Sequence, residues 1–144
     1  MKLLSVISWA VFVPIISYSQ TFGSNPNGVI NDLSTTDFPL TVSGLASSID
    51  TTVFGLESVC MNLTHTYDSD LEIYLIAPDG TSVSLISHIG GADDNFTNTC
   101  LDYNASASVA LQAAPFTGTY KPMGELGLVN NDQNPNGIWV LRVV

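Results

Sequence analysis

The sequence predicts an all-β domain, an antiparallel β-sandwich of the jelly-roll type, on three observations. Short segments alternate apolar and polar residues with a period of two, which is the pattern of half-buried strands. Turn-forming Gly, Pro, Asn and Asp residues separate these segments at short intervals, as they do in sandwiches. No long stretch repeats apolar residues with the 3.6-residue period of an amphipathic helix. A length of 144 residues suits a single domain.

The first 19 residues match a secretory signal peptide. One lysine precedes a short apolar run over residues 3–16, and the small residues Ser17 and Ser19 fit a cleavage site between Ser19 and Gln20. A membrane anchor is the alternative, but the run is shorter than the roughly 20 apolar residues that a spanning helix needs. We therefore expect a secreted, extracellular protein with no membrane span after cleavage.

The polar residues that follow predict an irregular N-terminal arm over residues 20–48. Turn formers crowd its centre, with NPNG at residues 25–28, and residues 39–42 carry the signal of a short first strand. Residues 49–144 are assigned to the sandwich itself. Within them, alternate apolar residues from Val59 to Tyr67 predict a strand that leads into the clearest motif of the chain.

That motif is a β-hairpin over residues 71–86. Leu71, Ile73 and Leu75 share one face of an extended segment, and the same alternation resumes after a turn. The turn is Pro-Asp-Gly at residues 78–80, in which proline presets φ and glycine accepts a positive φ. The apolar face of this hairpin should therefore line the core.

The charge balance excludes one class of function. The chain carries 13 acidic and 3 basic residues, a net charge of −10, and removal of the signal peptide would leave 2 − 13 = −11. Nucleic-acid binding needs a basic patch, which two separated cations cannot form. An acidic surface fits solubility or cation binding instead.

Two sequence blocks resemble the P domain (P/Homo B domain) of proprotein convertases. They are HTY, DLEIYL and APDGT within residues 65–81, and NPNGIWVLRV at residues 134–143, in the order that the family has them. The resemblance covers about residues 53–144 and implies a galactose-binding-like jelly roll, the module that follows the catalytic domain in subtilisin-like serine proteases. That family continues past its Trp-containing strand into a further strand, so we expect a domain that lacks its last strand.

The resemblance implies a non-catalytic accessory module that stabilises or tunes a protease domain and so takes part in proteolysis. The residues agree, since His65 and His88 are the only histidines and no Gly-x-Ser-x-Gly nucleophile motif is present. The expected partner is a protease or other catalytic domain, in cis or in trans. A module that binds cell-surface glycans or proteins is the alternative, which an exposed aromatic cluster on one sheet face would favour. Trp139 could stack on such a ligand, but the resemblance implies that it is a core residue, and its parity with Leu141 and Val143 agrees.

Two cysteines, Cys60 and Cys100, can make one intramolecular disulfide in an exported protein. Each alternates with inward-facing neighbours, so both should face outward from their strands. A thiolate metal site is the alternative, but the chain has no CxxC spacing and no histidine beside either cysteine. The pattern therefore favours a disulfide between two strands.

The loop GGADDN at residues 90–95 is a candidate calcium site. Calcium prefers six to eight hard oxygen ligands, many of them carboxylates. The carboxylates that can supply them are Asp70, Asp93, Asp94 and Asp102, with Asp68 close by in the sequence. A plain solvated acidic loop is the alternative, and Asp70 could instead cap a turn through backbone N–H groups. The resemblance favours a structural ion, because bacterial members of this fold often carry calcium.

Overall fold

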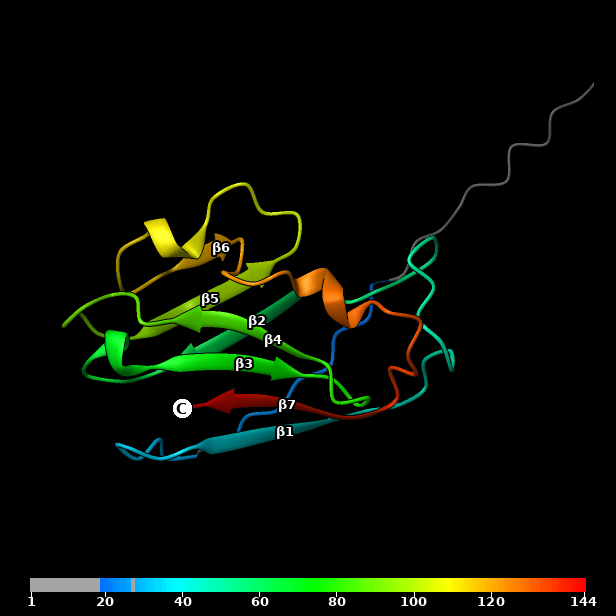
Figure 1. Cartoon of the computed structure of the whole chain (residues 1–144), viewed down its shortest axis with the longest axis horizontal. Helices are drawn as coiled ribbons and strands as arrows, with labels where there is room; N and C mark the ends of the chain where they lie inside the picture. Colours follow the sequence, from blue (N-terminus) through cyan, green and yellow to red (C-terminus); the bar gives the residue numbers. More distant parts are fainter. Residues whose placement is uncertain (1–18, 27) are drawn as a thin grey trace, which may run out of the picture.

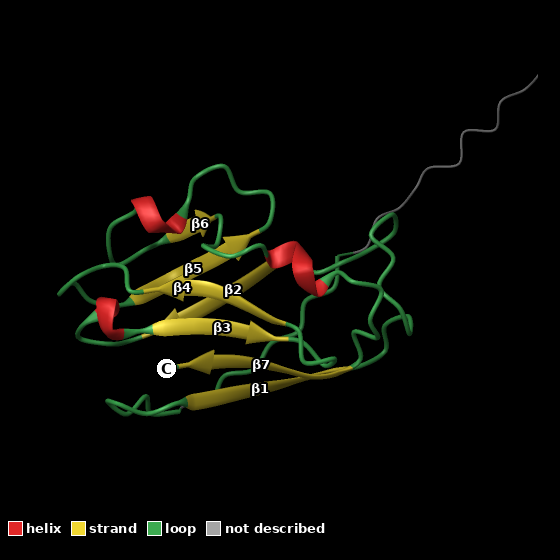
Figure 2. Ribbon diagram, in the orientation of Figure 1, coloured by secondary structure: helices red, strands yellow, loops and turns green. Residues whose placement is uncertain are grey.

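The computed structural model describes residues 19–26 and 28–144, which form two β-sheets packed against each other (Figures 1 and 2). One sheet has four strands and the other has three. In order across the sheets, the strands are β1 (Thr36–Val42), β7 (Gly137–Val143), β3 (Glu72–Ile76) and β4 (Ser82–Ser87), then β2 (Ser58–Leu63), β5 (Phe96–Asp102) and β6 (Gly118–Tyr120). Short 3₁₀ turns lie in the connections, namely η1 (Asp68–Asp70), η2 (Val109–Leu111) and η3 (Leu126–Val129). The prediction of an all-β sandwich is confirmed.

The N-terminal predictions are only partly visible. The signal peptide lies outside the described residues, except for Ser19, which is exposed as is its neighbour Gln20. No helix in the described part of the chain is long and apolar enough to cross a membrane. Phe22 and Ile30 of the arm pack against the core, and the first strand extends further than predicted, over residues 36–42.

The core lies between the sheets, and alternate residues of both sheets fill it. Ile73 and Leu85 of the hairpin are fully buried, as the alternation predicts. Phe96 stacks on Phe116 with ring centroids 4.8 Å apart. Trp139 is buried and donates its indole N–H to the Pro135 carbonyl at 2.9 Å, which satisfies its polar tip and confirms it as a core residue.

The predicted hairpin is confirmed as β3 and β4. At its turn the Ala77 N–H donates to the Thr81 carbonyl at 2.8 Å, and Gly80 adopts a φ of +89°. The Asp79 carboxylate accepts the Thr81 N–H at 2.8 Å and the Thr81 hydroxyl at 2.9 Å. Proline, aspartate and glycine thus each contribute to the reversal.

The strand before the hairpin is shorter than predicted. β2 ends at Leu63, so the extension of this strand to Tyr67 is wrong. The His65 N–H donates to the side-chain oxygen of Asn95 at 3.2 Å, and Tyr67 is 52% exposed rather than inward-facing. A side-chain oxygen here accepts the N–H that would otherwise bond to a neighbouring strand, and the chain then enters η1.

The second sheet departs from a wholly antiparallel arrangement. β6 runs parallel to β5, with Thr99 opposite Gly118, whereas β2 and β5 are antiparallel. Cys60 and Cys100 lie directly opposite each other on β2 and β5 and form a disulfide, which confirms that prediction. The bridge closes a loop of 40 residues, a contribution of about 4 kcal/mol in the chain-entropy model.

Candidate functional site

The turn η1 and the loop between β4 and β5 form a closed corner at one end of the sandwich (Figure 1). The Asp68 N–H donates to the Asp93 carbonyl at 3.2 Å, and the Ser69 N–H donates to the Gly91 carbonyl at 3.2 Å. In return the Asn95 N–H donates to Oδ1 of Asp68 at 3.0 Å. These bonds wrap the loop around one carboxylate.

Glycine at position 90 makes this wrapping possible. Gly90 has a φ of +91°, a conformation that side chains rarely adopt. A Cβ built there would lie 2.8 Å from the Asp68 Cβ and 3.0 Å from the Phe116 ring. The loop therefore needs a glycine at this position both for its backbone and for its close approach.

Asp68 is the most unusual polar group of the described residues. Its side chain is fully buried, and its Oδ2 has no hydrogen-bond partner within the described part of the chain. Burial raises the pKa of Asp68, and the nearby charges of Asp94 and Asp93 act in the same direction, against the Asn95 N–H and His65. A buried carboxylate oxygen without a donor is satisfied by a proton or by a cation.

The structure separates the predicted calcium ligands. Asp93 and Asp94 lie in the loop beside Asp68, and Asp70 ends η1 with an exposed side chain. Asp102 is the last residue of β5, whereas the loop precedes that strand, and its carboxylate accepts the Asn104 N–H at 2.7 Å. No group of three or more His, Cys, Asp or Glu side chains among the described residues is arranged to hold a metal ion.

Next to the corner, His88 is held between two acceptors. Its Nε2 lies 2.8 Å from Oε1 of Glu72, and its Nδ1 lies 2.8 Å from the Ser69 carbonyl oxygen. Both partners only accept, so the ring satisfies both when each nitrogen carries a proton. The Ser69 carbonyl and then Glu72 raise the pKa of His88, while the Tyr74 hydroxyl and then His88 lower the pKa of Glu72.

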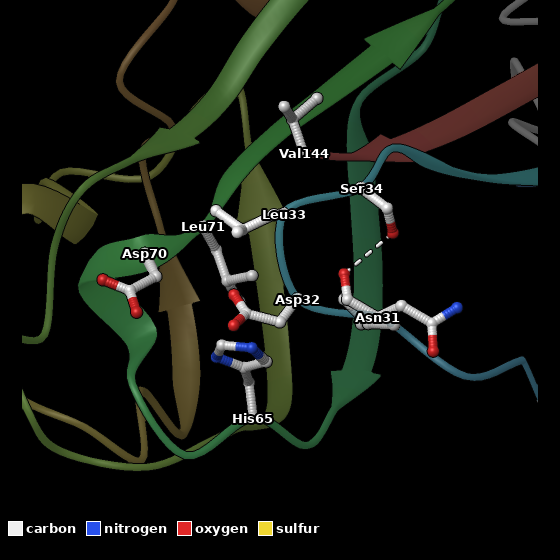
Figure 3. Close-up of a pocket in the computed structure, with 9 residues that line it drawn as sticks. Asn31, Asp32, Leu33, Ser34, His65, Asp70, Leu71 and Val144 are labelled. Atoms are coloured by element: carbon white, nitrogen blue, oxygen red, sulfur yellow. Dashed lines mark hydrogen bonds between the residues drawn. The ribbon is translucent and has the colours of Figure 1, made fainter.

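A small hollow lies beside this end, between the arm and η1 (Figure 3). It measures about 20 Å³, and its lining residues are Ile30, Asn31, Asp32, Leu33, Ser34, His65, Asp70, Leu71 and Val144. The Ser34 hydroxyl in it donates to the Asn31 carbonyl at 2.8 Å and is not directed at His65. The hollow is far smaller than the roughly 300–1,000 Å³ of a typical ligand pocket. An open depression of about 450 Å³ adjoins it and is lined also by Ser69, Glu72 and His88.

Neither histidine is part of a nucleophile–base pair in the described residues. Nδ1 of His65 lies 2.9 Å from the Tyr67 carbonyl oxygen, and His88 contacts a backbone carbonyl and Glu72. A serine protease mechanism requires a serine hydroxyl hydrogen-bonded to the imidazole. The site is thus a corner with one buried carboxylate and one imidazole held between two acceptors.

The comparisons with known proteins concern the domain as a whole rather than the corner. A family model described as "Proprotein convertase P-domain" matches residues 57–144. The curated relative "Leupeptin-inactivating enzyme 1" of Streptomyces exfoliatus is 42% identical over 105 residues. This alignment covers 73% of the chain and 17% of the relative, so the chain spans less than a fifth of that protein's length. No solved structure matches the chain significantly.

Proposed function

Because this chain belongs to the proprotein convertase P-domain family, we propose that it is a non-catalytic accessory module of a subtilisin-like serine protease. The observation that carries the proposal is the family match over residues 57–144, which includes six of the seven strands. The bonding of His65 and His88 to acceptors other than a serine hydroxyl supports the non-catalytic role. The relative indicates an enzyme as the larger protein.

The role proposed is stabilisation of the catalytic domain, in cis or in trans. A folded partner that binds only the native state raises the free energy of unfolding by mass action. The module would therefore slow thermal inactivation without touching the reacting atoms, and would tune how the enzyme responds to pH.

A domain exchange tests this function. Residues 20–144 replace the matching segment of Leupeptin-inactivating enzyme 1, and the half-life of the enzyme at an inactivating temperature is compared with that of the enzyme lacking the segment. We expect the exchanged enzyme to survive longer. Equal half-lives would contradict the stabilising role.

We also propose that the protein is exported, with cleavage between Ser19 and Gln20. The disulfide between Cys60 and Cys100 supports this, because such bridges persist in oxidising compartments. N-terminal sequencing of the secreted product should begin at Gln20. Retention of the uncleaved chain inside the cell would contradict the proposal.

The corner around Asp68 supports a structural calcium ion. Oδ2 of Asp68, which has no hydrogen-bond partner within residues 19–26 and 28–144, fits a cation that prefers oxygen ligands, and Asp93 and Asp94 lie close enough to affect the pKa of Asp68. A bound ion would compensate the buried charge and hold the loop to η1. Asp70 is the further carboxylate in the corner, whereas Asp102 caps a turn elsewhere.

Melting curves with calcium and with chelator test this site. We expect calcium to raise the Tm of the wild-type chain and of Asp102→Asn, but to leave Asp68→Asn unchanged. A wild-type Tm that chelator does not alter would count against the ion. Loss of the response in the Asp102 variant would show that the ion lies elsewhere.

The glycan-binding alternative has no structural support of the kind it needs. The exposed aromatic side chains among the described residues are Tyr67 and Tyr103. Tyr67 lies beside the loop that precedes β5, whereas Tyr103 follows the other end of that strand. They do not form a cluster on one sheet face.

A further inference from the structure

Cleavage between Ser19 and Gln20 would make a glutamine the first residue of the mature chain. Ser19 and Gln20 are both exposed and belong to no helix or strand. No backbone hydrogen bond joins either of them to another residue of the described chain. After cleavage, the new α-amine and the side chain of Gln20 would therefore both be free to react.

A glutamine at the N-terminus of a chain can react with itself. Its α-amine nitrogen attacks the side-chain carbonyl carbon Cδ, and the new C–N bond closes a five-membered lactam. The side-chain amide nitrogen takes up the proton that the attacking amine releases and leaves as ammonia, so the reaction needs no oxidant, reductant or other reactant. Both groups belong to one residue, which gives them a very high effective concentration. The attacking amine must be neutral, and because α-amino groups have a pKa of about 8, part of the population is neutral near pH 7.

We infer that Gln20 is converted to an N-terminal pyroglutamate, an inference that rests on the proposed export and cleavage. The lactam nitrogen carries no positive charge, so the mature chain loses its α-ammonium group. Its cationic side chains are then Lys121 and Arg142. Aminopeptidases bind their substrates through a free α-amine, so a lactam at this position blocks stepwise trimming of the arm.

The arm that the lactam would protect is held to the sandwich by side-chain packing. Phe22 and Ile30 pack against the core, and a Cβ at Gly28 would collide with the ring of Phe38 in β1. Within the described chain, no backbone hydrogen bond anchors residues 20–26 or 28–30. Chain ends that few contacts hold are where proteolysis concentrates. Phe22 is the third residue counted from Gln20, so the loss of only three residues would remove the first of these contacts.

The secreted product of the full-length chain tests the modification. It is incubated at mildly alkaline pH and cut before Asp32 by a protease specific for aspartate, and the peptide of residues 20–31 is measured by mass spectrometry, because a lactam blocks stepwise Edman sequencing. We expect this peptide to be lighter than its encoded residues by the mass of one ammonia. The matched control is Gln20→Ala, which has no side-chain amide and should keep its full mass.

A second readout measures protection of the arm. The wild-type protein and the Gln20→Ala variant are incubated with an aminopeptidase of broad specificity, with and without prior treatment by a pyroglutamyl peptidase that removes the lactam residue. We expect the wild type to be trimmed only after that treatment, and the variant to be trimmed in both cases. Trimming that removes Phe22 should lower the Tm, because an apolar contact with the core is lost.

The possible results distinguish this inference from the export on which it rests. A peptide that begins at Gln20 and keeps its ammonia after the incubation would overturn the pyroglutamate and leave the cleavage standing. A secreted product that begins at another residue would overturn both. Trimming of the wild type without the pyroglutamyl peptidase would overturn the protection of the arm, and an unchanged Tm after the loss of Phe22 would overturn the anchoring role of that residue.

Discussion

The two ends of the sandwich are fastened by different chemistry. At the end that holds η1, which we call the carboxylate end, the loops converge on Asp68 and His88, whose charge depends on pH. At the opposite end, which we call the amide end, neutral amide side chains hold the loops together by hydrogen bonds to the backbone (Figure 1). Asn136 accepts the Leu45 N–H at 2.9 Å and donates to the Leu45 carbonyl at 3.0 Å.

The amide end repeats this two-sided bond. Asn130 accepts the Leu56 N–H at 2.8 Å and donates to the Leu56 carbonyl at 3.1 Å. Gln133, which is buried, donates to the Val129 carbonyl at 2.7 Å. Amides satisfy donors and acceptors at any pH, so these amide bonds should be insensitive to protons and cations. A carboxylate near this end, Asp79, accepts a bond from Asn131 that lowers its pKa, so it responds only to strong acid. The responses of the protein at milder pH should arise at the carboxylate end.

The largest loss in the free energy of unfolding is expected from steric crowding at the carboxylate end. Gly90→Ala would introduce a Cβ that lies 2.8 Å from the Asp68 Cβ, at a φ of +91°. Gly80→Ala, in the hairpin turn near the amide end, has a similar φ of +89° but open space around it. We expect losses of about 3 and about 1 kcal/mol respectively in the free energy of unfolding, from urea titrations. Equal losses would mean that the loop does not press on Asp68.

The next largest loss in the free energy of unfolding is expected at the amide end. Asn136→Ala removes both bonds to Leu45 and should cost about 2 kcal/mol, by the same amount at mildly acidic and at neutral pH. Asn136→Asp keeps the acceptor but turns a carboxylate oxygen toward the Leu45 carbonyl, so its loss should be larger at neutral pH than in acid, where the protonated carboxyl can donate. Urea titrations at two pH values measure both. A pH-dependent loss for Asn136→Ala would remove the contrast between the ends.

A smaller effect of opposite sign is expected for Asp68→Asn in the presence of chelator. The folded-state pKa of Asp68 is raised, so its charged form destabilises the fold above that pKa, and this penalty disappears as the pH falls toward 3.8, the value of an ordinary aspartate. The variant should therefore melt at a higher temperature than the wild type at neutral pH, and the difference should vanish in acid. A variant that melts lower at neutral pH would show that the carboxylate is compensated without an ion.

The smallest effect should come from His88, because its ion pair with Glu72 is exposed to solvent. The raised pKa of His88 means that its contribution is fully present below the ordinary value of 6.5 and is lost as the pH rises through the folded-state pKa. Titration of the imidazole by NMR should show a pKa above 6.5, and Glu72→Gln should lower it. The absence of any change in that variant would assign the shift to the Ser69 carbonyl.

Period-two alternation and turn chemistry were sufficient to predict the hairpin, the burial of Trp139 and the pairing of the two cysteines. The hairpin and the burial of Trp139 depend on residues that are near one another in the sequence. The cysteine pairing follows because the chain has only two cysteines. The end of β2 at Leu63 could not be predicted, because the acceptor that replaces the ladder is Asn95, 30 residues further along the chain. The parallel pairing of β6 is equally non-local.

The candidate site was harder to predict for the same reason. Asp68 and Asp70 have identical side chains two residues apart, and only the fold shows that Asp68 is enclosed while Asp70 is exposed. Asp102 has the right chemistry but lies at the far end of β5 from the loop. Composition identifies which groups can bind a cation, whereas burial decides which of them lacks another partner.

The disulfide has a consequence for the proposed work of this module beside a protease. Cys60 and Cys100 both lie on the three-stranded sheet, yet the chain between them crosses to the other sheet, forms β3 and β4, and returns. A single cut anywhere between these cysteines, including the exposed loop around Asp93, therefore releases no fragment. The nicked protein would remain one covalent molecule until it met a reductant.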